Sequence, residues 1–511
     1  MNTFALPRFL IIYGVALPVA LLLGYLLATP DSITTMGVVG LVLAMLLLPV
    51  FLRWHHQMLV FSWNATIIVF FLPGQPDLWM VLAAGSLLLT ILERAMNPDQ
   101  RLQQVPSVTW PLLFLGLVVI ITAKLTGGIG LRSLGGGVYG GRKFYFILAA
   151  TIGYFALSCR QVPSRNTDRY GSIFFLSGLT SAFPNLIYMA GANLWFLFLI
   201  FPVGFAIAQA SEDFSDVVLG ARFSRVTGFT YACTALFCYM IVRYGLRGIF
   251  DYRRPWRLVT WLLLIAVSML GGYRSGLIIF GLVFAFQFWL EGLFRTRLFP
   301  ILALAGILSG AFLVPFVTKL PLSVQRSLSM LPLEIDPAAR ADAQSSLEWR
   351  LEMWKVLLTQ VRQYFFLGKG YAIDPADLYL IQESMRRGLA KGFEGAIVSG
   401  DYHSGPLSIL IPFGIFGLIA FVWFLAAGLR VLYRNYRYGD PSLTKLNTLL
   451  LSYFATHVVF YFVGFGSLHS DLALFTGLIG LSVALNHGMR GPPANVATFG
   501  PEAGLATVGA V

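Results

Sequence analysis

The sequence predicts an all-α, polytopic helical membrane protein, and three observations indicate this fold class. Of the 511 residues, 57% are apolar and only 12% are charged, whereas an ordinary soluble domain carries about twice that share of charge. The mean hydropathy is +0.75. The apolar runs last for whole helical spans and do not alternate over about ten residues, as the strands of a membrane barrel do. Because lipid offers no partners to backbone polar groups, we expect helices to form the spans.

Apolar runs bounded by polar residues or by Gly and Pro mark the individual spans, and we predict about 14 transmembrane helices. They fall at 8–28, 33–52, 57–73, 77–92, 107–125, 144–160, 171–190, 228–246, 256–272, 275–292, 298–316, 406–429, 446–465 and 470–487. The positive-inside rule then places both termini on the inner side of the membrane. We interpret the apolar segment 193–209 as re-entrant or interfacial, because a full crossing there would reverse the sidedness of everything upstream.

The spans divide the chain into five parts. We expect N-terminal helices over 1–210, central helices with outer-face arginines over 211–316, an outward-facing loop domain over 317–405, C-terminal helices over 406–490 and a disordered tail over 491–511. The long loop carries ten acidic and ten basic residues between Val317 and His403, a balance more typical of a folded segment than of a disordered one.

One amphipathic helix is predicted inside the loop domain. Ser345 and Glu348 have the spacing of a capping box, so we expect the helix to begin at Ser345. Four apolar side chains then share one face: Leu347, Leu351, Trp354 and Leu358. A helix with this pattern is suited to lying on the membrane surface.

The charge balance and the cysteines exclude several classes of function. A net charge of +13 would suggest nucleic acid for a soluble chain, but here it reflects arginines in membrane loops, so we expect no nucleic-acid partner. The three cysteines lie in apolar stretches without a CxxC pair, and neither HExxH nor an EF-hand pattern is present. We therefore expect neither a metal nor another cofactor.

Arginines on the predicted outer face are the strongest functional signal, because the rule that sets topology disfavours them there. They are Arg222, Arg225, Arg274 and Arg350. Arg274 follows Tyr273 in a tight hairpin between two spans. A guanidinium at the membrane boundary offers a fork of donors suited to phosphate or diphosphate. The alternative is that these side chains reach lipid phosphates and only anchor helices.

The glycine-rich segment 126–141 lies on the same predicted side. It lacks the Lys-Ser/Thr ending of a P-loop, so we interpret it as an outer loop that places Arg132, Arg142 and Lys143 within reach of phosphate.

His403 is the candidate for acid–base chemistry. It stands where the long loop ends and an apolar run begins, and a histidine at such a boundary can act as a general base near neutral pH. The alternative is a histidine at a helix start that bonds to the backbone. Asp401 is positioned either to orient the His403 ring or simply to be a polar loop residue.

The order of these motifs resembles that of the O-antigen ligase and polymerase superfamily over about residues 210–430. The matching features are Arg222 or Arg225 with Gly228, the hairpin Arg274-Ser275-Gly276, the loop residues Arg350, Trp354, Phe366, Gly368 and Gly370, and the closing series His403, Leu407, Leu410, Gly414 and Gly417. Ser404 stands where that family usually has Asn.

The resemblance implies a metal-independent membrane glycosyltransferase that acts at the outer face of the inner membrane in cell-surface polysaccharide synthesis. The donor would be a polyprenyl-diphosphate-linked glycan, and the acceptor a glycan, a lipid A core or a protein. Arg222, Arg225, Arg274 and Arg350 would bind the diphosphate, and His403 would activate the acceptor hydroxyl. Trp354, Asp401 and Tyr273 would support the site.

Two rival functions stay open at this point. A lipid-linked oligosaccharide flippase or other transporter would place its charges inside spans around a midplane cavity. A structural scaffold would use the long loop as a partner-binding domain. Polymerase, ligase and protein O-oligosaccharyltransferase are not distinguished.

Overall fold

The computed structural model describes residues 17–22, 24–25, 33–72, 74–97, 103, 105–127, 141–210, 225–389 and 391–492. Most of these residues are helical, and within them the only β-type pairing is an isolated bridge between Ile68 and Asp77. The predicted all-α fold class is therefore confirmed. Arg222, Arg132, the acidic segment 211–216 and the C-terminal tail from 493 lie outside the described residues.

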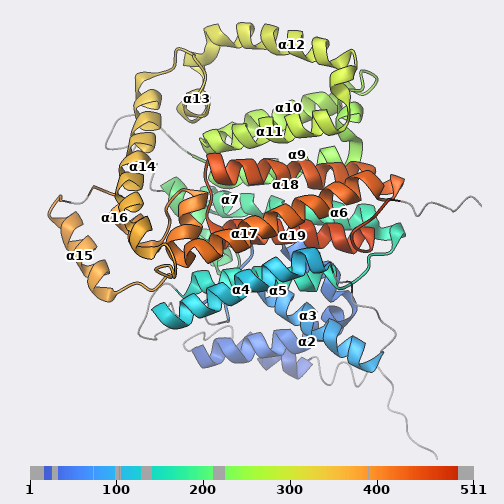
Figure 1. Ribbon diagram of the computed structural model, residues 1–511, viewed down its shortest axis with the longest axis vertical. Coiled ribbons are helices and arrows are strands. Elements are labelled where there is room, and N and C mark those ends of the chain that lie inside the picture. The colour runs from blue at the N-terminus through green and yellow to red at the C-terminus, as the bar shows by residue number, and fades with distance from the viewer. Residues whose placement is uncertain are drawn as a thin grey trace, which may run out of the picture.

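Most helices run side by side as one bundle (Figure 1). The N-terminal half contains α2 (Ile33–Ser62), α3 (Leu78–Met96), α4 (Pro106–Thr126), α5 (Arg142–Ser158), α6 (Thr167–Leu176), α7 (Phe183–Ala190) and the 3-10 helices η2 (Ser164–Asn166), η3 (Ser177–Ala182) and η4 (Ala192–Leu199). The central part contains α9 (Thr227–Ile249), α10 (Pro255–Ser268), η5 (Met269–Gly271), α11 (Arg274–Leu290), η6 (Leu293–Arg295), α12 (Leu298–Leu313) and η7 (Val314–Lys319). After them come α13 (Leu322–Leu328), α14 (Pro337–Tyr364), α15 (Pro375–Arg386), α16 (Glu394–Ser399), α17 (Gly405–Tyr438), η8 (Pro441–Leu443), α18 (Thr444–Val463) and α19 (Leu468–Asn486).

Eight helical segments of the described residues are long and apolar enough to cross a membrane. They are Leu78–Met96, Pro106–Thr126, Ser164–Ala190, Thr227–Ile249, Leu298–Lys319, Gly405–Tyr438, Pro441–Val463 and Leu468–Asn486. Two shorter apolar helices, Pro255–Gly271 and Arg274–Leu290, lie beside them. The protein is thus a multi-pass helical membrane protein, and the number of 14 spans stays a prediction.

The region 33–73 differs from the two spans predicted there. A single helix, α2, covers Ile33–Ser62 with a kink at Trp54, and irregular chain follows it. The polar residues around the kink resemble a loop in the sequence, but His55 and His56 are both buried. His55 Nδ1 lies 2.7 Å from Ser86 Oγ, and His56 Nε2 lies 3.0 Å from the Leu157 carbonyl oxygen. These side chains have partners inside the bundle, so the chain stays buried where two helical pieces meet at the non-helical Trp54 and forms no exposed loop there.

The segment 193–209 forms no single long helix. The 3-10 helix η4 is followed by helical residues 204–210, and the Asn185 amide donates to the Phe205 carbonyl over 3.1 Å. The apolar side chains of η4 are exposed, as they are on a surface that meets lipid. The interfacial assignment of this segment stays a prediction.

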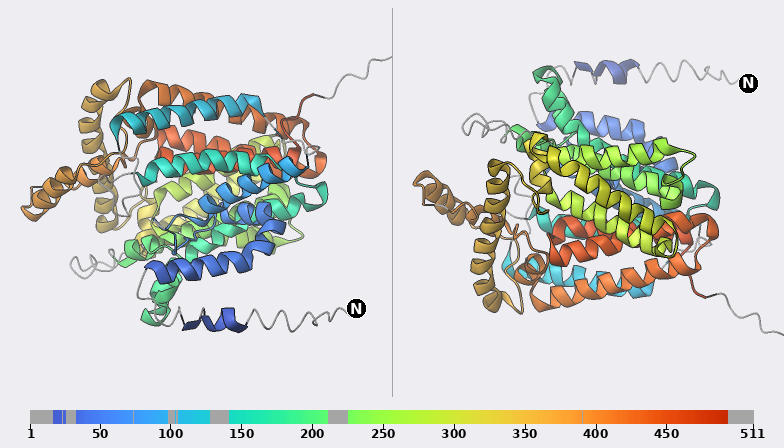
Figure 2. Two further views of the ribbon diagram at one scale, coloured as in Figure 1. Left: turned by 90° about the horizontal axis from the view of Figure 1, so that it is seen from below. Right: turned by 90° about the horizontal axis from the view of Figure 1, so that it is seen from above.

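The helices α13, α14, α15 and α16 gather at one end of the bundle, where α14 runs across the direction of the spans (Figure 1). Views from below and above show the same placement, with α15 projecting farthest (Figure 2). These four helices are called the end layer below. A small apolar cluster joins the end layer to the spans, and in it Met353 and Leu357 of α14 contact Leu407 and Ile411 of α17. The long loop is thus packed directly onto the membrane helices.

The prediction that a helix begins at Ser345 is wrong. The helix α14 begins eight residues earlier at Pro337, where the Asp336 side chain accepts a hydrogen bond from the Ala338 amide over 2.8 Å. Asp followed by Pro is a strong helix start, because the side chain caps a free amide and Pro fits the first turn. Ser345 lies inside the helix and bonds back to the Asp342 carbonyl. The face with Leu347, Leu351 and Leu358 is exposed.

The Trp63 side chain packs between two helices, α5 and α19. Its indole packs against Gly153 of α5 and Gly477 of α19, and its Nε1 donates to the Ala473 carbonyl over 2.9 Å. Inside a membrane, small residues permit such close contact, and packing replaces much of the hydrophobic driving force. The indole therefore sets the distance between α5 and α19, and the same contacts fix the orientation of the indole.

We expect Gly477→Ala to destabilise the protein, because a Cβ atom at this position would overlap the Trp63 indole. Overpacking of this kind costs about 1–3 kcal/mol. The apparent melting temperature of the purified protein in detergent should fall relative to wild type. Gly306→Ala in α12 is the control, since a Cβ atom there has nothing within 4 Å. Equal melting temperatures for Gly477→Ala and Gly306→Ala would show that the Trp63 indole can move aside for the added methyl group.

Candidate functional site

Arg274 lies at the first position of α11, in the hairpin that the sequence singled out. Gly272 precedes it with φ of +68°, a left-handed conformation in which glycine is favoured. The turn brings Arg274 beneath α14, and its Nη2 donates to the Ala343 carbonyl over 3.1 Å. The missing side chain at Gly272 also leaves room for Arg225, whose Cδ would lie 3.0 Å from a Cβ atom there. Two of the predicted arginines thus meet at one hairpin.

Asp342 of α14 is the carboxylate that holds this corner together. Arg225, which directly precedes α9, donates from Nη2 to Asp342 Oδ2 over 3.0 Å. Arg326 of α13 pairs with the same oxygen through Nε and donates from Nη1 to the Gly272 carbonyl over 2.8 Å. One acidic side chain therefore ties α13, α14 and the start of α9 to the hairpin of Arg274.

Arg326 and Asp342 are functional candidates that the sequence reasoning missed. Arg326 lies in the long loop, where the positive-inside rule gives no signal. In the structure it is 8% exposed. Burial and the charge of Arg225 lower the pKa of the Arg326 guanidinium, while Asp342 opposes the shift.

Arg350 lies two turns of α14 beyond Ala343, and it faces the same charges. Burial lowers the pKa of the Arg350 guanidinium, and the positive charge of Arg274 lowers it further. Neither Arg274 nor Arg350 forms an ion pair with a carboxylate among the described residues. Two of these four guanidinium groups, those of Arg225 and Arg326, thus pair with Asp342, while Arg274 and Arg350 have no carboxylate partner among the described residues, so positive charge is in excess at this corner.

His403 lies next to Arg350 in an unusual backbone conformation. Its φ is +50°, a left-handed value that costs a non-glycine residue energy and is frequent at functional sites. The ring meets Trp349 and Phe465 with centroids 5.3 and 5.1 Å apart. Its Nδ1 is buried and has no hydrogen-bond partner in the described part of the chain. Within that part, Nδ1 therefore makes no bond to the backbone.

The electrostatic surroundings keep the His403 imidazole neutral. Burial lowers the pKa of His403, and the positive charge of Arg350 lowers it further, while Asp401 opposes both. A neutral imidazole is the form that can accept a proton.

The loop that carries His403 is tied down on both sides. Trp354 Nε1 donates to the Tyr402 carbonyl over 2.9 Å. Lys143 of α5 donates to Asp401 Oδ1 over 2.7 Å and to the Ser399 carbonyl over 2.6 Å. The charge of Lys143 and this hydrogen bond outweigh the effect of burial, so the pKa of Asp401 is below its usual value.

Asp401 was expected to orient the His403 ring or to be a plain loop residue, and its contacts support neither role as stated. Its two carboxylate oxygens bond to Lys143 and to the Ser399 hydroxyl. An ammonium group is the stronger partner for a partly buried carboxylate. Asp401 therefore fixes the loop to α5, and its charge also acts directly on His403, whose pKa it raises against the effects of burial and of Arg350. Lys143, predicted to be available to phosphate, is occupied by this contact, and Arg142 lies 3.9 Å from Asp77.

The match to a family model covers most of this site. Residues 258–422 match the model described as O-antigen ligase. This region is therefore similar to an O-antigen ligase domain. The match spans 165 of the 511 residues and includes Arg274, Arg326, Arg350 and His403, whereas Arg225 and Lys143 precede it. It confirms the resemblance drawn from the motifs, and it indicates a membrane glycan ligase or polymerase. No curated protein matches the chain.

We expect geranylgeranyl diphosphate to raise the melting temperature of the protein in detergent, because the anion would relieve the repulsion among the arginines. A ligand at about 100 times its Kd stabilises by about 2.7 kcal/mol. The shift should shrink in Arg274→Ala and Arg350→Ala and persist in Arg437→Ala, which changes the far end of α17. Geranylgeraniol, which lacks the diphosphate, controls for the tail. An equal shift with the alcohol would contradict an anion site.

Proposed function

We propose that the protein is a glycosyltransferase that moves a glycan from a polyprenyl-diphosphate-linked donor to an acceptor hydroxyl. The observation that carries the proposal is a cluster of arginines beside His403: Arg225 and Arg326 pair with Asp342, Arg274 bonds to the Ala343 carbonyl of the same helix, and Arg350 lies between the charge of Arg274 and His403. The arrangement would supply anion recognition and a base, and all of these residues except Arg225 lie in the region that matches the O-antigen ligase model. Arg222, which lies outside the described residues, belongs to the same proposed diphosphate site.

The arginines would stabilise the leaving group. When the bond between the anomeric carbon and the diphosphate breaks, negative charge develops on the departing oxygen. Arg274 and Arg350, which have no carboxylate partner in the described structure, would donate to that oxygen and to its neighbours. Guanidinium groups would in this way neutralise the diphosphate without a divalent cation, so we propose a metal-independent reaction.

His403 would act on the acceptor. The neutral imidazole would take the proton of the acceptor hydroxyl as its oxygen attacks the anomeric carbon. The new glycosidic bond forms while the bond to the diphosphate breaks, and the electron pair leaves with the prenyl diphosphate. Trp354, Asp401 and Tyr273 have supporting roles: the first two hold the loop of His403, and Tyr273 lies beside Arg274.

We further propose that this chemistry takes place at the outer face of the bacterial inner membrane, with both termini in the cytoplasm. The arginine-rich loops 243–257 and 430–445 then lie on the cytoplasmic side, as the positive-inside rule requires. The polyprenyl tail would lie among the spans in the bilayer. The acceptor would be a further glycan unit, a lipid A core or a protein side chain, which corresponds to a polymerase, a ligase or a protein O-oligosaccharyltransferase.

A flippase for lipid-linked oligosaccharides is the second candidate, because it would recognise the same donor. The positions of the charges favour the enzyme: Arg274 begins a span, Arg326 and Arg350 lie in the end layer, and none of the three lies midway along a span. A transporter is expected to place such groups around a midplane cavity.

We expect Arg274→Ala and His403→Asn to abolish transfer while leaving membrane insertion intact. The assay follows release of prenyl diphosphate from a polyprenyl-diphosphate oligosaccharide, with and without acceptor. Loss of one charge-stabilising donor costs about 10²- to 10³-fold in rate, and loss of a general base about 10²- to 10⁴-fold. Asn tolerates a left-handed backbone, so His403→Asn preserves the turn.

Arg437→Ala, at the far end of α17, is the matched control for this assay and should release prenyl diphosphate at the wild-type rate. The identity of the acceptor that stimulates release would name the enzyme type. Binding of donor without release, under every acceptor, would favour the flippase, and normal rates in both site variants would overturn the assignment.

We expect transfer to fall at acidic pH, with the midpoint below the ordinary histidine value of about 6.5. The folded protein lowers the pKa of His403, so the base stays neutral until the pH drops through that lowered value. Arg350→Gln removes one cause of the shift and should move the midpoint to higher pH, beside any loss in donor binding. A midpoint that stays in place, or moves to lower pH, would contradict this role. The measurement is the initial rate at saturating donor between pH 4.5 and 8.

A further inference from the structure

A recess of about 620 Å³ lies at the end of α11 that is opposite Arg274. It is lined by Trp289, Gly292, Phe294 and Arg295, where α11 passes through η6 into α12. The 17 residues of α11 make a helix about 25 Å long, which is close to the hydrocarbon thickness of a bilayer. The recess is therefore at the other membrane boundary from the proposed catalytic site.

The side chains of this recess are accessible to a ligand. Trp289 is 64% exposed and Phe294 is 47% exposed. Arg295 is exposed as well, and its guanidinium has no ion pair or hydrogen bond among the described residues. Glu291, the acidic residue closest in sequence, is bound on α9, where its carboxylate oxygens accept from the amides of Leu246 and Arg247 over 2.9 and 3.4 Å. The recess thus presents a free positive charge beside free aromatic surface.

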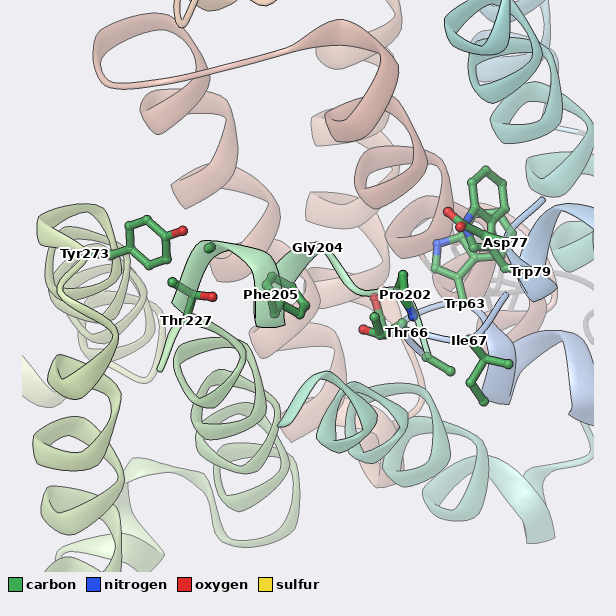
Figure 3. Close-up of a pocket in the computed structure, with 13 residues that line it drawn as sticks. Trp63, Thr66, Ile67, Asp77, Trp79, Pro202, Gly204, Phe205, Thr227 and Tyr273 are labelled. Atoms are coloured by element: carbon green, nitrogen blue, oxygen red, sulfur yellow. The ribbon is translucent and has the colours of Figure 1, made fainter. Parts of the chain in front are cut away.

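The cavity beside Tyr273, of about 490 Å³, differs in this respect (Figure 3). Trp63 and Trp79 are buried there and pack on each other with ring centroids 5.1 Å apart. The Asp77 carboxylate lies 3.9 Å from the Arg142 guanidinium, so its charge has a partner. We assign no ligand to that cavity.

Apolar surface continues from the recess along α11 and α12. On α11, Ala285 and Gly281 are exposed about one and two turns from Trp289, and a Cβ atom at Gly281 would have nothing within 4 Å. On α12 no residue is buried. Only 6% of the apolar window of Leu298–Lys319 is buried, against 28–72% in the other seven candidate spans of the described residues. Between its ends, α12 runs apart from α10 and α11 (Figure 1). Lipid chains are the natural cover for this surface.

The charge at the recess matches an anionic lipid headgroup. Arg297 follows Arg295 by two residues, and it too is exposed and has no carboxylate partner in the described part of the chain. A guanidinium binds phosphate oxygens through paired donors. The Trp289 indole combines an apolar ring with an N–H group, which suits the level of the headgroups. A zwitterionic lipid would bring its own cation to these arginines, so electrostatics favour a lipid with net negative charge.

We propose that the recess binds an anionic diacyl phospholipid. Arg295 binds the phosphate, Trp289 and Phe294 contact the glycerol region, and the acyl chains lie along α11 over Ala285 and Gly281. This goes beyond the proposed function, because it assigns a second lipid site at the opposite boundary of the bilayer. On the proposed topology this boundary is the cytoplasmic one. The bound chains would fill the space between α11 and α12.

The test measures lipid binding by native mass spectrometry of the full-length protein in detergent. The protein is titrated with phosphatidylglycerol and, separately, with phosphatidylcholine that has the same acyl chains. We expect wild type to prefer phosphatidylglycerol. Arg295→Gln should bind phosphatidylglycerol about fivefold more weakly, as for the loss of one arginine near a lipid surface. Trp289→Ala, which removes apolar contact without a change of charge, should weaken binding too.

Arg165→Gln is the matched control. Arg165 is exposed in η2, which follows the end of α5 that is remote from Lys143 and the His403 loop, so it lies at the same end of the bundle as the recess. This variant loses the same charge and should bind phosphatidylglycerol like wild type. Equal weakening in Arg165→Gln and Arg295→Gln would show a general attraction to arginines and would overturn the site, as would equal affinity of wild type for the two lipids.

The melting temperature without added lipid shows whether Arg295 serves the fold. Arg295→Gln should melt like wild type, because the guanidinium bonds to nothing in the described protein. A clear loss of stability would attribute the weaker binding to the fold and would overturn the argument from Arg295.

The same measurement separates other occupants. Geranylgeranyl diphosphate should leave bound phosphatidylglycerol in place, because its proposed site is at the other end of α11. Its displacement of the phospholipid would assign the recess to the prenyl donor and overturn the proposal. A lipid-free dimer that dissociates in Arg295→Gln would assign the recess to a second copy of the chain, with the same consequence.

Discussion

The ion pairs of Asp342 with Arg225 and Arg326 are the interaction on which the end of the bundle that carries α13 and α14 depends. Like charges brought together in a partly desolvated place repel, and the lowered pKa values of Arg326 and Arg350 express that repulsion. The negative charge of Asp342 offsets part of this repulsion, because its carboxylate pairs with Arg225 and Arg326. By bonding to groups from two other segments, it also determines where α14 lies over the hairpin.

The position of α14 then determines the rest of the site. The helix supplies Arg350 on the side of Arg274, and it supplies Trp349 and Trp354, which contact the ring and the loop of His403. The apolar contact of Met353 and Leu357 with α17 holds the same helix against the spans. One helix therefore holds Arg350 in place and contacts both the Arg274 hairpin and the loop of His403, which come from other elements.

Much of this arrangement follows from the sequence, for physical reasons that can be named. The all-α class follows from apolar runs that are long enough to span a membrane. The position of Arg274 at the membrane boundary follows from the hairpin between two predicted spans, which is too tight to hold an exposed loop. Arg225, Arg350 and His403 also lie together as expected. Each of these residues lies at the edge of a span or on a long helix. At such positions the local sequence pattern restricts the surroundings that the side chain can have.

The remainder depends on contacts between distant parts of the chain, which no local pattern encodes. Lys143 and Asp401 are 258 residues apart, and nothing near either residue indicates the other. His55 and His56 look like loop residues until Ser86 and the Leu157 carbonyl supply buried partners. The start of α14 shows the same limit on a smaller scale: two capping signals compete, and Asp336 with Pro337 prevails over Ser345 because the intervening residues are good helix formers.

The O-antigen ligase domain is not sufficient by itself for the site that surrounds it. His403 has a left-handed backbone that persists only if neighbouring contacts enforce it, and such strain is typically about 1–3 kcal/mol. One of the two ties beside it comes from Trp354 inside the domain, but the other comes from Lys143 of α5, which precedes the matched residues. Trp63, whose orientation is fixed between α5 and α19, likewise precedes them. The N-terminal helices thus contribute to the candidate site, because Lys143 of α5 holds the loop of His403 from outside the residues that the family model matches.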